Sequence, residues 1–194
     1  IDDILPGARI SNAKVNDADS KIFFVSGAGG SIGSEITRQL LSGNPKKIIL
    51  FELSEYNLFQ IERECQAIVE SKNLDSEIIP ILGDIRDKNN LSYIFKKFQI
   101  DHVYHAAAYK HVPLVENEYN LAKAAENNII GTYNLAQVSV ENNVSSFVMI
   151  STDKAVRPSN VMGATKRFAE IVIQSMNAIS TGTKLCMVRF GNVI

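Results

Sequence analysis

Cysteine and histidine are scarce in this sequence and tryptophan is absent: the 194 residues include two Cys and three His. Cys65 and Cys186 stand far apart, and neither belongs to a CxxC pair, so neither a disulfide framework nor a zinc site is indicated. His102 and His105 lack the HxxxH or HExxH spacing of metal ligands. We therefore expect two reduced core thiols and no bound metal.

An excess of one charge is missing as well. Twenty basic and 21 acidic residues leave a formal charge of −1, so no overall basic field points to nucleic acid. No apolar run approaches the roughly 20 residues of a membrane helix, and no signal segment opens the chain. With 45% hydrophobic residues the composition is that of one globular domain. We expect a cytoplasmic protein with a small-molecule partner.

Both ends of the chain look cut. The first residue is Ile1 rather than Met, and residues 190–194 directly follow a strand-like run. Residues 1–20 contain four Asp, one Pro and one Gly with little periodicity, which is typical of a connecting segment. We predict a linker over residues 1–20 and a C-terminally truncated domain over residues 21–194.

From residue 21 onward, short apolar runs alternate with longer amphipathic stretches. Strands are expected at 22–25, 47–51, 78–82, 102–104, 147–150 and 185–188. Helices are expected at about 31–42, 55–72, 88–98, 119–142 and 160–180. This alternation predicts an α/β fold with a doubly wound parallel sheet of the Rossmann type. Ligands bind at the carboxyl ends of the strands in such sheets, so the residues after each strand form the candidate site.

A glycine run follows the first expected strand. Gly27, Gly30 and Gly33 form a GxxGxxG pattern that, with Ser31 and Ile32, opens an amphipathic helix. Glycine permits a tight turn and a close approach to a pyrophosphate, and the helix N-terminus offers N–H groups to the phosphates. We interpret the run as a dinucleotide-binding turn; a glycine-rich turn that binds nothing is the alternative.

Glu52 ends the second expected strand, nineteen residues beyond Gly33. This is near the spacing at which a carboxylate accepts hydrogen bonds from the adenosine ribose. The carboxylate would repel a 2′-phosphate, and no Arg stands immediately beside it, so the sequence favours NAD over NADP. The alternative is a surface Glu that caps a helix starting near Ser54.

The residues after the third and fourth strands complete the predicted cofactor site. Asp84 is placed to accept a hydrogen bond from the adenine amino group while Ile85 covers the ring. The small side chains of Ala106, Ala107 and Ala108 would let the dinucleotide lie close to the backbone. A tightly packed strand end is the plain alternative.

Titratable residues follow the fifth expected strand. Thr152, Asp153 and Lys154 stand at its end, and Met162 and Lys166 are four residues apart on one face of the next helix. This grouping indicates a candidate catalytic site. A turn with helix-capping residues is the alternative.

These motifs resemble a known family, the extended short-chain dehydrogenases. More narrowly, they resemble its polysaccharide-biosynthesis (CapD-like) branch, which contains UDP-N-acetylglucosamine 4,6-dehydratases. The likeness runs from about residue 21 to residue 193. It is carried by the glycine run, Glu52, Asn128 and the stretches 106–113, 151–155 and 160–167.

The resemblance implies a UDP-hexosamine substrate and bound NAD. Hydride would leave sugar C4, water would be eliminated across C5 and C6, and the hydride would return to C6. Lys166 would hold the nicotinamide ribose, and Thr152 would bond the C4 hydroxyl. Asp153 would protonate the departing O6, and Lys154 would take the C5 proton. Asn128 would belong to the cofactor site.

Met162 departs from the wider superfamily, which carries at this place a Tyr that removes the hydroxyl proton. A thioether cannot act as a base, and the narrower branch shares the Met. The group that deprotonates O4 is left open. The candidates are a bound water and the side chains of Asp153, Tyr104, Tyr109 and Tyr133.

By the same resemblance, Lys110 and Asn192 would contact the nucleotide sugar, although Lys110 and its neighbour His111 also suit a solvated loop. Most of the uridine site would follow residue 194. Segments 119–142 and 160–180 would pair in a homo-oligomer. Residues 1–5 are similar to the segment that follows a membrane-anchored part in long relatives. Such an anchor would place the protein on the cytoplasmic face of the inner membrane.

Two other functions fit some of these residues. A related epimerase or reductase would use the same cofactor, but an epimerase would normally carry Tyr at position 162 and lack the Asp153-Lys154 pair. A non-catalytic NAD-binding module would explain Met162, but it would have little reason to keep Asp153, Lys154 and Lys166 together.

Overall fold

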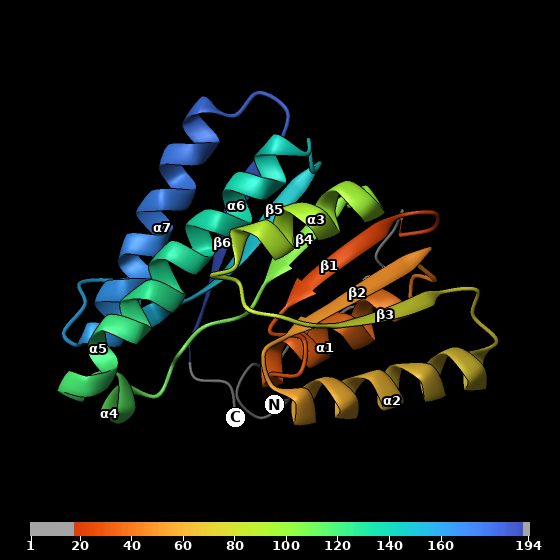
Figure 1. The fold of residues 1–194 in the computed structure, drawn as a ribbon, viewed down its shortest axis with the longest axis horizontal. Helices are drawn as coiled ribbons and strands as arrows, with labels where there is room; N and C mark the ends of the chain where they lie inside the picture. Colours follow the sequence, from red (N-terminus) through yellow and green to blue (C-terminus); the bar gives the residue numbers. More distant parts are fainter. Residues whose placement is uncertain (1–17, 192–194) are drawn as a thin grey trace, which may run out of the picture.

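The strands of the computed structural model, which describes residues 18–191, form one parallel sheet (Figure 1). Across the sheet they lie in the order β3-β2-β1-β4-β5-β6, and each neighbouring pair is parallel. Their bounds are β1 Ile22–Ser26, β2 Lys47–Glu52, β3 Glu77–Leu82, β4 His102–His105, β5 Ser146–Thr152 and β6 Lys184–Phe190. The predicted doubly wound Rossmann-type fold is confirmed.

Helices cover both faces of the sheet (Figure 1). The helices α1 and α2 pack on one face, and α3, α6 and α7 pack on the other. The α-helices are α1 Ser31–Leu41, α2 Glu55–Lys72, α3 Lys88–Phe98, α4 Val112–Val115, α5 Glu118–Ala125, α6 Thr132–Glu141 and α7 Val161–Ile179. A π-helix spans Glu126–Gly131, and a 3₁₀ turn spans Asp153–Ala155.

The core lies between the sheet and these two helical layers. Successive strand residues point to opposite faces, so Phe23 packs with the α1 and α2 side while Phe24 packs with the α3 and α6 side. The Phe24 ring lies between those of Phe51 and Phe95, at centroid distances of 5.2 and 5.1 Å. Burial on both faces explains why the strands are continuous apolar runs rather than alternating ones.

The stretch predicted as one helix over 119–142 is divided in the structure. It runs as α5, the π-helix and α6, and the short α4 before it was not predicted. A π-helical turn widens the helix locally and often marks a functional site. At its end, a Cβ on Gly131 would lie 2.5 Å from Ile85 Cδ1, so glycine makes room for the loop after β3. Nothing in the apolar periodicity revealed this adjustment.

The predicted linker falls mostly outside the described residues, which begin at Ala18. Ala18 is buried in the α1 and α2 side of the core, and Asp19 forms an isolated bridge with Pro45. Ala18 and Asp19 therefore contact the domain. Between residues 18 and 191, no helix is long and apolar enough to cross a membrane.

Candidate active site

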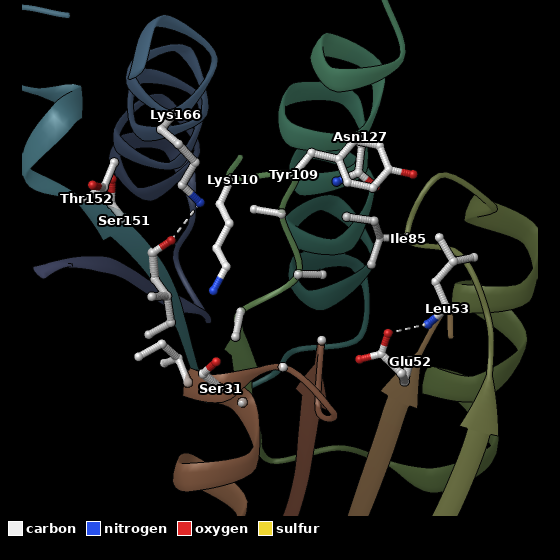
Figure 2. A pocket seen from close by; sticks show the side chains of 18 of the residues that line it. Ser31, Glu52, Leu53, Ile85, Tyr109, Lys110, Asn127, Ser151, Thr152 and Lys166 are labelled. Carbon is white, nitrogen blue, oxygen red and sulfur yellow. Dashed lines mark hydrogen bonds between the residues drawn. The ribbon is translucent and has the colours of Figure 1, made fainter. Parts of the chain in front are cut away.

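A cavity of about 900 Å³ opens along the carboxyl edge of the sheet, where Figure 2 shows side chains from both halves of the chain. Most of the predicted site residues line it. From the first half these are Gly27, Gly30, Ser31, Ile32, Gly33, Glu52, Asp84 and Ile85. From the second half they are Ala106, Ala107, Ala108, Lys110, Thr152, Lys154, Met162 and Lys166. Residues far apart in the sequence thus share one pocket, because parallel strands bring their ends to one edge.

The glycine turn is packed too tightly for other residues. Gly27 has a φ of +66°, and a Cβ there would lie 2.6 Å from the backbone nitrogen of Ala107. A Cβ on Gly33 would lie 2.0 Å from the carbonyl oxygen of Gly27. The turn delivers Gly30 as the N-cap of α1, whose first turn has no acidic side chain. Its N–H groups and partial positive charge therefore suit an anion such as a phosphate.

Glu52 holds the turn after β1 against the turn after β2. Its carboxylate accepts hydrogen bonds from the backbone nitrogens of Gly29 (3.0 Å), Leu53 (3.0 Å) and Ser54 (3.1 Å). The cap of α2 is Ser54, whose hydroxyl accepts from the nitrogen of Asn57. Glu52 therefore lies at the pocket wall with most of its acceptor sites already used by the backbone.

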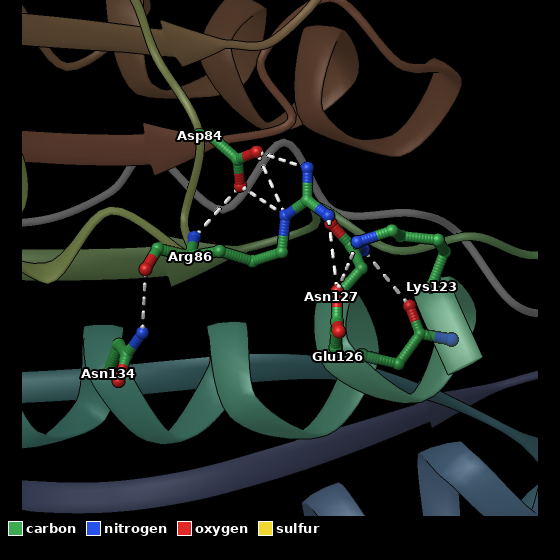
Figure 3. A network of polar contacts seen from close by, with 7 residues as sticks. Asp84, Arg86, Lys123, Glu126, Asn127 and Asn134 are labelled. Atoms are coloured by element: carbon green, nitrogen blue, oxygen red, sulfur yellow. Dashed lines mark hydrogen bonds and ion pairs between the residues drawn. The ribbon is translucent and has the colours of Figure 1, made fainter.

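Asp84 is paired with Arg86, which was not among the predicted site residues. The Arg86 guanidinium grips its carboxylate, with Nε 2.9 Å from Oδ2, and the Arg86 backbone nitrogen donates to Oδ1 at 2.8 Å (Figure 3). This hydrogen bonding holds the pKa of Asp84 below its usual range. The Arg86 carbonyl accepts from Asn134, and Nη1 lies 3.7 Å from Glu126. The network ties the loop after β3 to the π-helix and α6, and it leaves Asp84 few acceptor sites for an adenine.

His105, at the end of β4, lies below the pocket and is completely buried. Its ring nitrogens lie 2.7 Å from the Ser26 hydroxyl and 2.8 Å from the Thr132 hydroxyl. Burial, with a smaller contribution from the charge of Lys166, lowers the pKa of His105 to about 3. The ring is therefore neutral and joins β1, β4 and α6. Among the described residues, no group of His, Cys, Asp and Glu suits a metal ion.

Lys166 reaches the pocket from the first part of α7. Its Nζ donates a 2.7 Å hydrogen bond to the carbonyl oxygen of Ile150 on β5 (Figure 2). Burial lowers the pKa of Lys166 to about 8, and the charge of Glu170 opposes this effect. Met162, one turn earlier on the helix, is also buried at the pocket wall. The pocket thus contains a lysine that changes charge near physiological pH.

Thr152, Asp153 and Lys154 form a hydrogen-bonded group at the end of β5. The Thr152 hydroxyl lies 2.9 Å from Asp153 Oδ1, and Lys154 Nζ lies 3.3 Å from the same oxygen. The Thr152 hydrogen bond, followed by that from Lys154, lowers the pKa of Asp153. Thr152 and Lys154 line the cavity, whereas the exposed Asp153 does not. In this conformation Asp153 is an ionised carboxylate beside the pocket rather than an acid within it.

Asn128, predicted for the cofactor site, does not line the cavity. It is buried, and its side-chain amide bonds both backbone groups of Tyr109, at 2.8 and 3.0 Å, and the Thr165 hydroxyl at 3.0 Å. It therefore fastens the loop after β4 to α7. The neighbouring Asn127 lines the cavity instead. Since these partners are far from Asn128 in the sequence, its local pattern could not reveal this role.

The three tyrosines named as candidate bases differ in their position relative to the cavity. Of the three tyrosines considered, Tyr109 lines the cavity, while Tyr104 and Tyr133 do not. Lys110 points into the same pocket from the loop after β4 (Figure 2). Asn192 lies outside the described residues.

Fold and site together define a protein of the extended short-chain dehydrogenase class. A sequence profile described as polysaccharide biosynthesis protein matches residues 23–194. The chain belongs to this polysaccharide-biosynthesis family, in its CapD-like branch, as its motifs predicted.

The known relatives are longer than this chain. It is 49% identical to "Capsular polysaccharide biosynthesis protein CapD" of Staphylococcus aureus over 90% of its own length and 28% of the relative's. It is 35% identical to a Campylobacter jejuni "UDP-N-acetylglucosamine 4,6-dehydratase (inverting)" over 91% of its length and 50% of that protein. The solved structure of Pen from Bacillus thuringiensis matches with a TM-score of 0.81 and 34% identity, over 92% of this chain and 52% of that one. The chain thus spans half or less of the curated relatives named here.

Proposed function

We propose that this chain is the cofactor-binding and catalytic part of a nucleotide-sugar 4,6-dehydratase that uses NAD. The substrate would be UDP-N-acetylglucosamine or a similar UDP-hexosamine. A single cavity supports this function, because it is lined both by the glycine turn at the N-terminus of α1 and by Thr152, Lys154 and Lys166. The name of the Campylobacter relative supports this particular reaction.

The shape of the pocket and its hydrogen-bond donors suit a dinucleotide. The N-terminus of α1 would hold the pyrophosphate, because its first turn offers N–H groups and no acidic side chain. Glu52 and Ile85 would border the adenosine, and Ala106 to Ala108 leave space beside the backbone. We infer NAD rather than NADP because the Glu52 carboxylate would repel a 2′-phosphate. When bound, NAD supplies reversible hydride transfer.

The side chains after β5 would carry the proton transfers. Lys166 would hold the nicotinamide ribose, and Thr152 would hydrogen-bond the sugar O4. Once C4 is a ketone, the C5 proton is acidic, and Lys154 at the cavity wall would remove it. These two steps balance if a proton first passes from the Lys154 ammonium to the Asp153 carboxylate, 3.3 Å away, because the neutral amine can then accept the C5 proton and the carboxylic acid can protonate the departing O6. Because Asp153 is exposed, rotation between staggered side-chain conformers is open to it when the sugar binds.

The direct test is product formation by the full-length protein. We expect UDP-N-acetylglucosamine to give NMR signals of a C6 methyl group and a C4 ketone, with no net NADH. No product from a panel of UDP-hexosamines, despite bound NAD, would overturn the proposal.

A substitution tests the role of Asp153. We expect Asp153→Asn to lower kcat about 100-fold while NAD binding is retained, because an amide cannot protonate the leaving oxygen. The matched control is Asp75→Asn, an exposed residue between α2 and β3 at the opposite edge of the sheet. Unchanged product formation by Asp153→Asn would remove this residue from the mechanism.

A further inference from the structure

Behind the pocket lies a carboxylate to which the proposed mechanism gives no role. Glu170 stands on α7 one helical turn after Lys166, and its side chain is 0% exposed. A buried charge is costly unless it is paired and hydrogen-bonded. The contacts of Glu170 therefore indicate the role of this buried carboxylate.

Four hydrogen bonds reach this carboxylate from three elements. Ser151 Oγ donates to Oε1 at 2.7 Å. Arg189 binds in a bidentate manner, Nε to Oε1 and Nη2 to Oε2, both at 2.7 Å. Arg167 Nη1 donates to Oε2 at 2.9 Å. Although burial alone would raise it, these donors lower the pKa of Glu170 to about 2, so the carboxylate is ionised at neutral pH.

Two of these partners stand opposite each other on neighbouring strands. Ser151 of β5 and Arg189 of β6 are paired in register. Ser151 itself lines the cavity, as do the next residue, Thr152, and Phe190, which directly follows Arg189. Glu170 therefore holds the two strand ends together at the point where they enter the pocket.

The same carboxylate acts on Lys166 through its charge. Titratable groups on the elements that pack around this lysine include His105 of β4, Lys110 after β4, the Asp153-Lys154 pair after β5, Arg167 of α7 and Arg189 of β6. His105 is neutral, and the exposed Asp153 is paired with Lys154. Glu170 is the buried anion of this set, and it raises the pKa of Lys166 against the effect of burial.

We propose that Glu170 is a positioning residue for the reaction: it fixes the ends of β5 and β6 at the pocket and holds a buried negative charge one helical turn from Lys166. It touches neither sugar nor cofactor and acts through Ser151, Arg189 and Lys166. This inference rests on the proposed dehydratase function for its kinetic consequence, whereas its electrostatic consequence can be measured without substrate.

The test compares Glu170→Gln with the wild type in the full-length protein. The amide keeps the shape but loses the charge, so we expect kcat to fall about 10- to 100-fold as Thr152 shifts, with a smaller change in KM. The ¹³Cε signal of Lys166, assigned with Lys166→Arg, should titrate at lower pH than in the wild type. A role limited to folding would not move that titration.

Two further variants keep the test decisive. Glu64→Gln removes a carboxylate that pairs with Arg38 on the surface at 2.9 Å, and it should leave both readouts unchanged. Ser151→Ala removes the link to β5 alone, so it should lower kcat less than Glu170→Gln and leave the Lys166 titration in place. It also serves if Glu170→Gln does not fold.

The outcomes separate this inference from the proposed function. An unchanged Lys166 titration in Glu170→Gln, or wild-type kcat in both Glu170→Gln and Ser151→Ala, would overturn the positioning role. If the wild type makes no dehydrated product from any UDP-hexosamine, the proposed function fails, and the titration still decides whether Glu170 controls the charge of Lys166.

Discussion

The two halves of the pocket are built in different ways. The half formed by β1, β2 and β3 presents backbone groups, glycines and carboxylates that are already satisfied by neighbours, such as Glu52 with three backbone N–H groups. The half formed by β4, β5 and β6 presents hydroxyl and amine side chains, among them Lys166 with its lowered pKa. On the proposed function, the first half would hold the cofactor and the second would exchange protons with the sugar.

The two halves differ because their charged side chains are paired at different positions relative to the pocket. In the first half, Asp84 and Arg86 neutralise each other beside the pocket, so neither is poised to change charge. In the second half, the anion Glu170 lies behind the wall while Lys166 lies at it. On the proposed function, binding would depend on the close packing of the backbone, whereas reactivity would depend on Lys166, which stands one helical turn from a carboxylate that is itself paired with Arg167 and Arg189.

The largest effect is expected from a change that removes the chemistry and spares the fold. Lys166→Met should lower kcat about 1000-fold, because the side chain keeps its length but can neither hold the ribose nor carry a proton. Stability should not fall, since a buried amine costs free energy. Steady-state kinetics of the full-length protein with thermal unfolding measures both, and Lys72→Met, at the exposed end of α2, is the control. A kcat of Lys166→Met within tenfold of the wild-type value would contradict the assignment of the proton transfers to the half formed by β4, β5 and β6.

A change in the glycine turn should weaken cofactor binding by the half formed by β1, β2 and β3. Gly33→Ala would place a Cβ 2.0 Å from the Gly27 carbonyl oxygen, and backbone cannot yield as a side chain can. We expect NAD to bind about 100-fold more weakly, as calorimetry would show, because the turn must open. Gly30→Ala, where the nearest atom is 3.3 Å from the Cβ, should fold as the wild type does. Wild-type affinity in Gly33→Ala would mean that the turn does not hold the pyrophosphate.

The smallest effect is expected at Glu52, where NAD affinity should change without a change in kcat. Glu52→Ala leaves three backbone N–H groups without their acceptor, so NAD affinity should fall about tenfold. At saturating NAD, kcat should stay that of the wild type, because the reactive half is untouched. The control is Glu77→Ala at the opposite edge of the sheet, where the carboxylate pairs with Lys47. A fall in kcat as large as the fall in affinity would show that the two halves are not separable.

The sequence predicted the fold because its signals are local. Apolar runs of strand length, amphipathic stretches and the glycine run each lie within a few residues, and parallel strands must bring their ends together. Most of the predicted site residues consequently line one cavity. The same reasoning could not separate Asn127 from Asn128, because a π-helical turn decides which of the two faces the pocket.

The sequence alone determined the order of strands and helices along the chain, the place of the glycine turn and the identity of the candidate proton donors and acceptors. Only the tertiary structure decided their partners. Arg86 was found to hold Asp84, and Glu170 to hold Ser151 and Arg189, each 19 residues away from it. The physical reason is that burial and the distance between charges set the protonation of Lys166 and His105, and both arise only when strands and helices distant in sequence pack together.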